Sequence, residues 1–206
     1  KIAILTSLIA GQHVDFETIH TEGITKITTE DMKYAKKLNM AIKLLASSKR
    51  VGDTFSVLVA PMLLSEEHPL CNVNDVFNAV FVRGNMLGDA MFYGSGAGKL
   101  PTASAVVADV VDAAKHLHRN VVTRWDAGEL ELIPNAEAEH RFFVRVQGRS
   151  EAQKEQIREA FGSVEIVETE GLEDEFGFIT EVMTEGTYSK KAEAFPEIIH
   201  MIRLAD

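Results

Sequence analysis

The chain has 206 residues, of which 46% are hydrophobic and 25% are charged, and its formal net charge is −10. This composition is typical of a globular protein with one or two domains. The single cysteine, Cys71, excludes a disulfide framework and suits a reducing, cytoplasmic compartment. No apolar run reaches the roughly 20 residues that a membrane-spanning helix needs, so no membrane partner is expected.

The negative charge lies in the last part of the chain. Residues 1–120 contain 12 Lys/Arg and 12 Asp/Glu, whereas residues 121–206 contain 9 and 19 and carry the whole net charge. This change predicts a domain boundary near residue 120. The acidic second part argues against a nucleic-acid partner, because phosphates require a basic face. His, Cys and carboxylate residues show no metal-ligand spacing, so no metal site is expected.

Two helices are predicted in the first part of the chain. Residues 1–10 have the pattern of the end of an apolar helix, which Gly11 stops. Thr28, with Asp31 at the capping-box position, predicts a second helix over about 29–39. The apolar stripe expected on this second helix is Met32, Ala35 and Leu38.

Two hairpins and a third helix are predicted next. The turn signals are Val-Gly-Asp at residues 51–53 and Gly84-Asn85. The third helix, from about Pro101 to Leu117, has its proline near the first turn, where the missing N–H costs little. The expected strands are residues 41–50, 55–64, 77–83 and 89–94.

The tail follows an aperiodic stretch, residues 120–139, which is predicted to be a partly packed linker and holds the only tryptophan, Trp125. Beyond it the pattern predicts strand, helix, strand, strand, helix, strand, which is the ferredoxin-like order. The charged segment 171–177 is expected to be a solvated hairpin tip. The apolar stripe expected on the first tail helix is Ile157, Ala160 and Phe161.

The expected fold class is therefore α+β. Residues 1–119 are predicted to form a mixed-sheet domain with helices on one face, followed by the linker over 120–139. Residues 140–206 are predicted to form a ferredoxin-like βαββαβ domain.

A glycine-rich loop precedes the third helix and contains Gly94, Gly96 and Gly98. It does not match the dinucleotide fingerprint, because Lys99 stands where the third glycine is required, and it does not match a Walker loop, because Tyr93 replaces the first glycine. Glycines let the backbone approach a ligand, and a helix start presents N–H groups to it. A tight strand-to-helix turn explains the same residues.

Two stretches of sequence carry a family resemblance. They are EGITKITTED at residues 22–31 and GSGAGKLPTASAVVAD at residues 94–109. Together with the opening KIAIL, they resemble the C-terminal half of a bacterial homoserine dehydrogenase over residues 1–118. The strand order of the tail resembles the ACT domain that many members append. The family reduces aspartate β-semialdehyde to homoserine with NADH or NADPH, on the route to threonine and methionine.

The resemblance implies roles for four residues. Lys1 matches the lysine that donates a proton to the substrate oxygen, and burial beside the cofactor would lower its pKa toward working pH. From the residues alone, a solvated lysine at a helix end explains Lys1 better, and the resemblance reverses that preference. Gly98 matches the glycine that touches the nicotinamide end of the cofactor, with Gly96 in the same loop. Thr102 is expected either to contact substrate or carboxamide, or to cap the helix.

Other polar residues are expected to have plainer roles. Glu22 is assigned to a turn and Asp31 to the helix cap. Lys99, Asp109 and Asp112 are expected to face solvent.

The resemblance also implies a longer, cytoplasmic enzyme whose nucleotide-binding domain lies upstream. The chain alone is then expected to be inactive and to hold no tightly bound NAD(P). The expected partners are the small-molecule substrate, a second copy in a homodimer, and an amino-acid effector at the ACT-like tail. ACT effector loops usually contain Asp-Lys/Arg-Pro-Gly-Val, of which only Gly148 has a counterpart here. The alternative is a non-enzymatic small-molecule-sensing or dimerisation module built on the tail.

Overall fold

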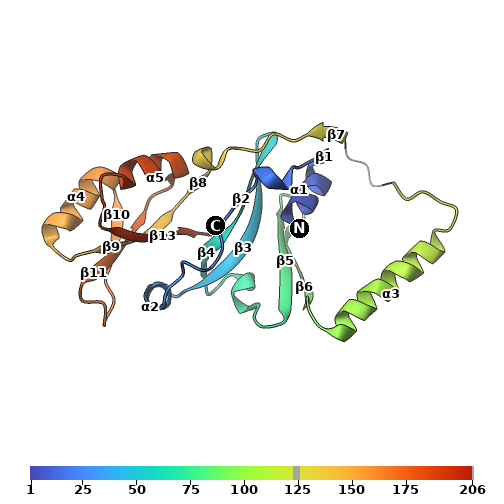
Figure 1. The fold of residues 1–206 in the computed structure, drawn as a ribbon, viewed down its shortest axis with the longest axis horizontal. Helices are drawn as coiled ribbons and strands as arrows, with labels where there is room; N and C mark the ends of the chain where they lie inside the picture. The colour runs from blue at the N-terminus through green and yellow to red at the C-terminus, as the bar shows by residue number, and fades with distance from the viewer. Residues whose placement is uncertain (123–125, 206) are drawn as a thin grey trace. The chain divides into compact units, whose positions relative to one another are not determined.

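The computed structural model describes residues 1–122 and 126–205, so Trp125 of the expected linker lies outside the described residues. The described chain forms two compact units (Figure 1). We call residues 1–65 with 126–205 the sheet unit, and residues 66–122 the hairpin unit. This spatial grouping joins the first 65 residues to the tail, whereas the division at residues 119 and 139 concerns modules along the sequence and stays a prediction.

One mixed sheet organises the sheet unit. Its strands run in the order β10-β11-β9-β13-β4-β2, with β3 also paired to β4. Parallel and antiparallel pairs share this sheet, which confirms the mixed sheet expected from the sequence. The strands are β2 (His20–Thr21), β3 (Met40–Val51), β4 (Thr54–Ser65), β9 (Phe142–Gln147), β10 (Val164–Val167), β11 (Glu175–Thr180) and β13 (Ile198–Leu204).

Strand β4 pairs with three other strands of this sheet. It pairs antiparallel with β3 along 12 residues through the predicted hairpin, and Gly52 supplies the positive φ of 61° that the turn requires. Two other strands share its opposite edge. β2 pairs in parallel at Leu58 and Val59, and β13 pairs in parallel at Met62 and Leu63. Pro61 lies between these two pairings and has no N–H for either strand.

Four helices pack in the sheet unit, and local signals explain where they begin and end. α1 stops at Gly11, whose φ of 70° is left-handed, and α2 begins with the complete capping box of Thr28 and Asp31. Ser150 and Gln153 form the same box on α4. The helices are α1 (Ile2–Ala10), α2 (Thr29–Lys37), α4 (Glu151–Phe161) and α5 (Glu185–Ala192).

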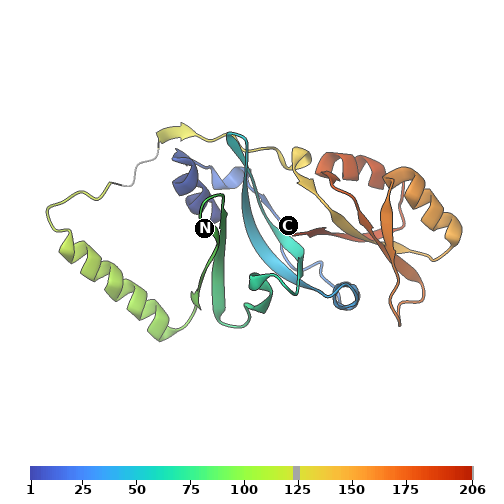
Figure 2. The ribbon, with the colours of Figure 1, turned by 180° about the vertical axis from the view of Figure 1, so that it is seen from behind.

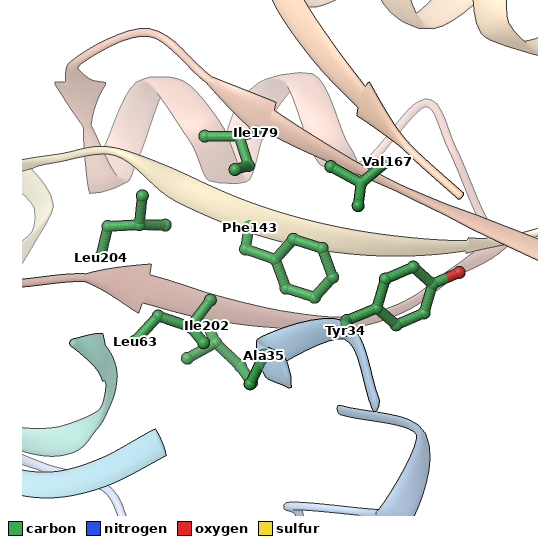
Figure 3. Close-up of a cluster of buried hydrophobic side chains, with 8 residues drawn as sticks. All are labelled: Tyr34, Ala35, Leu63, Phe143, Val167, Ile179, Ile202 and Leu204. Carbon is green, nitrogen blue, oxygen red and sulfur yellow. The ribbon is translucent and has the colours of Figure 1, made fainter. Parts of the chain in front are cut away.

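The tail strands are covered on both faces. α4 and α5 lie on one face, as Figure 1 and Figure 2 show. There Ile157, Phe161 and Tyr188 pack against the inward side chains of β9 and β11. α2 covers the opposite face, where Tyr34 meets Phe143 with ring centroids 5.2 Å apart (Figure 3). Burial of each such large apolar side chain contributes about 1.5–3 kcal/mol, so both faces stabilise the tail.

Short elements complete the sheet unit. β1 pairs in parallel with β7, and Leu132 forms a bridge to Phe55, so the expected linker packs partly against the first region. β12 pairs antiparallel with β8. These elements are β1 (Gln12–His13), β7 (Asp126–Glu129), β8 (Glu139–His140), β12 (Met183–Thr184) and the 3-10 helices Phe16–Thr18 and Asn135–Glu137.

The hairpin unit consists of the second predicted hairpin and the third predicted helix. β5 (Phe77–Gly84) and β6 (Gly88–Ser95) pair antiparallel, and Phe77 stacks on Tyr93 with centroids 4.9 Å apart. A short 3-10 helix, Pro69–Asn72, precedes β5. The helix α3 (Lys99–Lys115) begins two residues before the predicted start at Pro101.

Two details differ from the sequence expectations. Met32 was expected on the buried stripe of α2 but is 58% exposed. The side of α2 that carries Tyr34 and Ala35 packs against the tail instead, and Tyr34 has no exposed surface. The charged segment 171–177 is not a fully solvated tip, because Glu175 is only 9% exposed and is held by a buried arginine. None of the described helices combines the length and apolar character that crossing a bilayer requires.

Candidate functional site

Lys1 lies at the start of α1 and lines a cavity of about 240 Å³. The Lys1 carbonyl accepts a hydrogen bond from the N–H of Leu5, and Lys1 is exposed. The walls of the cavity are mainly apolar, and the polar side chains among them are an ammonium, an imidazole and a hydroxyl. The cavity is lined by Lys1, Ala3, Ile4, Ser7, His13, Val14 and Phe16.

Buried hydrogen bonds fix the floor of this cavity. The Ser7 hydroxyl, 3% exposed, accepts the N–H of Val14 at 3.0 Å and ties α1 to the following segment. The preceding residue, Thr6, donates its hydroxyl to that of Ser48 on β3 at 2.9 Å. Lys1 therefore stands on a helix whose position is set by the sheet. His13 enters the same cavity, and sequence reasoning did not single it out because a lone exposed histidine carries no spacing signal.

Gly96, Gly98 and Thr102 lie together in the hairpin unit, at the start of α3. Gly98 is the N-cap residue with φ 120° and ψ 152°, a conformation that only glycine adopts readily, and no side chain caps the helix. A Cβ on Gly96 would lie 2.0 Å from the Asn78 amide nitrogen, so a side chain there would have to displace that of Asn78. The first N–H groups of α3 thus lack a side-chain acceptor.

Thr102 does not cap α3, because it lies inside the first turn and donates its own N–H to the Gly98 carbonyl at 3.1 Å. Thr102 is exposed. Lys99 and Asp109 are exposed as expected, and exposed Asp112 lies 3.5 Å from His116. Among the described residues, no group of three or more His, Cys, Asp or Glu side chains is arranged to hold a metal ion.

Glu22 does more than form a turn. Its carboxylate accepts from both terminal nitrogens of Arg203 on β13, at 3.1 and 2.8 Å, and lies 2.6 Å from His20. Arg203 is 2% exposed and also donates to Glu185 of α5. Burial alone would raise the pKa of Glu22, but the hydrogen bonds from Arg203 and His20 outweigh it and lower that pKa to about 2.

Asp31 caps α2 as expected and also joins a second buried network. Its carboxylate accepts the Thr28 N–H at 2.8 Å and a guanidinium N–H of Arg145 on β9 at 2.8 Å. His200 of β13 lies 3.0 Å away. Burial alone would raise the pKa of Asp31, but the hydrogen bonds from His200 and Arg145 outweigh the effect of burial and lower that pKa to about 2.

The second network continues into the charged segment of the tail. Arg145, 3% exposed, holds Glu175 through two parallel hydrogen bonds of 3.0 and 2.7 Å. Its guanidinium lies 5.9 Å from the Tyr34 ring centroid. Two buried tail arginines therefore bind the acidic residues at both ends of the 22–31 segment, and no local sequence pattern predicts either contact.

Comparison with known proteins shows which family the chain resembles. A family model described as homoserine dehydrogenase matches residues 1–111. The homoserine dehydrogenase of Synechocystis sp. is 46% identical over 150 residues, covering 71% of this chain and 33% of the relative. That of Mycobacterium tuberculosis is 33% identical over 218 aligned positions, covering 96% of this chain and 49% of the relative.

Solved structures give the same result over the whole length. The crystal structure of a homoserine dehydrogenase from Thiobacillus denitrificans matches with a TM-score of 0.86 and 30% identity, covering 100% of this chain and 52% of that one. The chain thus spans about half the length, or less, of the curated relatives it matches. The match over residues 1–111 covers more than half of the chain, and on that ground the chain belongs to the homoserine dehydrogenase family.

Proposed function

We propose that this chain is the substrate-binding and regulatory half of a longer cytoplasmic oxidoreductase. The enzyme interconverts aspartate β-semialdehyde and homoserine with NAD(P), on the route to threonine and methionine. The observation that carries the proposal is the family match over residues 1–111, which begins at Lys1. Residues 1–119 are the proposed catalytic domain, 120–139 the linker and 140–206 an ACT-like domain.

Lys1 is the proposed acid–base residue. In the direction of reduction, its ammonium donates a proton to the carbonyl oxygen as that oxygen gains negative charge, which leaves a neutral amine and an alcohol. In the reverse direction, the neutral amine accepts the hydroxyl proton. The cavity of α1 supports this role, because it places the Lys1 side chain against a fixed, mainly apolar wall of suitable size for a small aldehyde.

The start of α3 fits the nicotinamide end of a dinucleotide. The first N–H groups of the helix have no side-chain cap and suit an amide or phosphate oxygen. Gly98 and Gly96 keep this face free of side chains, and exposed Thr102 offers a hydroxyl for the carboxamide. NAD(P), when bound, supplies or takes up the hydride. The rest of the nucleotide is expected to lie on an upstream domain, so the chain alone should be inactive.

Residues 140–206 are the proposed ACT-like domain. The elements β9, α4, β10, β11, α5 and β13 follow the βαββαβ order, and the sheet order β10-β11-β9-β13 is that of a ferredoxin-like fold. A homodimer and an amino-acid effector are the proposed partners of this domain.

The test of the enzymatic proposal uses the full-length protein. Lys1→Ala is expected to lower kcat by roughly 100-fold or more, since general acid catalysis contributes about 10²–10⁴-fold, while KM changes less. Lys36→Ala, at an exposed position of α2, is the matched control and should keep normal turnover. A Lys1→Ala enzyme with near-normal kcat would contradict the assignment. Micromolar NADPH binding by the 206-residue chain alone would contradict the missing-domain proposal.

The alternative is a non-enzymatic small-molecule-sensing or dimerisation module. One observation favours it: the tail is joined to segment 22–31 by two buried networks, as a sensor and its scaffold would be. The sequence encoded before Lys1 discriminates the two. A strand followed by Gly-x-Gly-x-x-Gly supports the enzyme.

A further inference from the structure

We propose that Arg203 of the tail is a positioning residue for the cavity at Lys1, because it holds one wall of that cavity in place through Glu22. The wall belongs to residues 13–22, which we call the wall segment. Arg203 does not itself line the cavity. The inference rests on the proposed function, since it takes this cavity as the place where the aldehyde substrate meets Lys1.

The cavity at Lys1 is formed by two stretches of chain. One is the helix α1, which carries Lys1, and the other is the wall segment, which contributes His13, Val14 and Phe16. A small aldehyde bound at Lys1 therefore contacts side chains from both. The position of the wall segment relative to α1 decides whether the carbonyl oxygen comes within hydrogen-bond reach of the ammonium.

The start of the wall segment is fixed without any help from residues 140–205. The N–H of Val14 donates to the buried Ser7 hydroxyl of α1, and His13 belongs to β1, which pairs with β7. α1 is itself joined to β3 through the hydrogen bond from Thr6 to Ser48. These contacts hold the helix and the first residues of the wall segment together.

The far end of the wall segment has only a short backbone anchor. Strand β2 is two residues long and pairs with β4 at Leu58 and Val59. One further backbone hydrogen bond follows, from the N–H of Glu22 to the Val59 carbonyl at 2.7 Å. Just before β2, Ile19 packs in the same cluster as Ala3 of α1. A shift of β2 along β4 would therefore disturb the packing beside Lys1.

The contact between Glu22 and Arg203 strengthens this short anchor. Two hydrogen bonds, of 3.1 and 2.8 Å, join the carboxylate to both terminal nitrogens of the guanidinium, which fixes its direction as well as its distance. Arg203 is in turn held by Glu185 of α5 and lies on β13, in register with Met62 of β4. The tail thus supplies a rigid, buried partner at the point where β2 ends.

The other buried arginine of the tail lies on a different path. Arg145 donates to Asp31 of α2, and α2 packs through Tyr34 and Ala35 in a separate cluster with Leu63. No member of that cluster lines the cavity at Lys1. Loss of the Arg145 contacts should therefore loosen α2 and leave the wall segment in place.

The experiment is steady-state kinetics of the full-length enzyme with Arg203→Lys. Lysine keeps a positive charge beside Glu185 but lacks the planar fork that binds Glu22. We expect kcat/KM for aspartate β-semialdehyde to fall about tenfold or more, mainly through a higher KM, because a displacement of about 1 Å can cost up to about 100-fold. The KM for the nicotinamide cofactor should not change, since Gly96, Gly98 and Thr102 lie in the hairpin unit.

The rise in KM separates positioning from instability, because a smaller folded fraction lowers the apparent kcat and leaves KM as it was. Arg145→Lys is the matched control: it removes the same kind of buried contact and should leave the KM for the aldehyde unchanged. Circular dichroism and urea denaturation report how much each variant is destabilised.

Glu22→Gln tests the same contact from its other, partly exposed side. It should raise the KM for the aldehyde as Arg203→Lys does. The double variant should lose no more than the larger single loss, since both changes break one interaction.

Two outcomes would overturn the positioning role while Lys1→Ala still abolishes turnover. One is an equal KM for the aldehyde in Arg203→Lys, Arg145→Lys and the parent enzyme, and the other is additive losses in the double variant. Near-normal turnover of Lys1→Ala would instead overturn the acid–base assignment, and the positioning role with it.

Discussion

Arg203 is the largest fully buried side chain of the described chain, and it is charged. A buried guanidinium is tolerated when carboxylates saturate it, and here Arg203 donates two hydrogen bonds to Glu22, just after β2, and two to Glu185 of α5. Glu185 is itself only 6% exposed. Arg203 and Glu185 therefore depend on one another, since either one left alone would be a charge in a poorly solvated site.

We expect Arg203→Met to destabilise the 206-residue chain by about 3–5 kcal/mol, because it leaves the buried Glu185 carboxylate without its guanidinium partner and removes one of the two partners of Glu22. The measurement is the free energy of unfolding from urea denaturation followed by circular dichroism.

Arg158→Met is the matched control. Arg158 pairs with Glu155 on the exposed face of α4, with side chains 42% and 63% exposed, and such pairs contribute about 0–1 kcal/mol. Equal losses for the two variants would show that the buried network contributes no more than a surface pair.

At the scale of the elements, the helix α1 ends at Gly11 because this residue has a left-handed backbone conformation. Gly11 has a φ of 70°, and a Cβ there would meet no atom within 4 Å. Gly23 also has open space for a Cβ, but its φ lies outside the left-handed region. The two positions therefore separate backbone strain from crowding.

We expect Gly11→Ala to lower the free energy of unfolding by about 1–2 kcal/mol, because alanine disfavours the left-handed conformation. Gly23→Ala should change it by about 0.5 kcal/mol or less. Urea denaturation of both variants checks the difference, and a loss at Gly23 as large as that at Gly11 would argue against strain as the cause.

The elements also show what the sequence alone could predict. Gly11, the Thr28–Asp31 box and the turn at Gly52 are local signals, and the helices and hairpin that they predict are confirmed. The burial of Met32 was predicted wrongly, because helical periodicity does not specify which side of α2 faces the tail. Tyr34 occupies that side instead.

The buried arginines were not predictable from local pattern. Arg145 meets Asp31 from 114 positions away, and Arg203 meets Glu22 from 181 positions away. Sequence pattern alone predicts that such arginines are exposed to solvent, since charged residues are rarely buried. Of the candidate site, Lys1 and Gly98 came from family resemblance, and their chemical roles stay predictions. His13 came from the structure alone.

For the whole molecule, the two networks tie stability to pH. The pKa of Glu22 falls from 4.5 to about 2 and that of Asp31 from 3.8 to about 2, so folding favours both ionised forms. Their contribution to stability is complete above about pH 4.5 and is lost as the pH falls toward 2.

We expect the urea midpoint of the 206-residue chain to fall steeply between pH 4.5 and 2. Glu22→Gln should make this fall shallower, because the amide does not titrate. Glu159→Gln, at an exposed position of α4, should leave the slope unchanged. A slope that is the same in Glu22→Gln and in the parent chain would remove Glu22 from the explanation.

The pairing of β13 with β4 sets an order of events during synthesis. Leu204 lies beside Leu63, so the ribosome adds the partner of β4 long after β4 itself. Until β13 emerges, β4 can pair only with β3 and β2 among the described strands, and the edge of β4 at Leu63 stays unpaired. Bringing β13 to β4 closes a long loop, which is slow. Nascent chains should therefore be most prone to aggregate, and most dependent on chaperones, in the interval between the emergence of β4 and the emergence of β13.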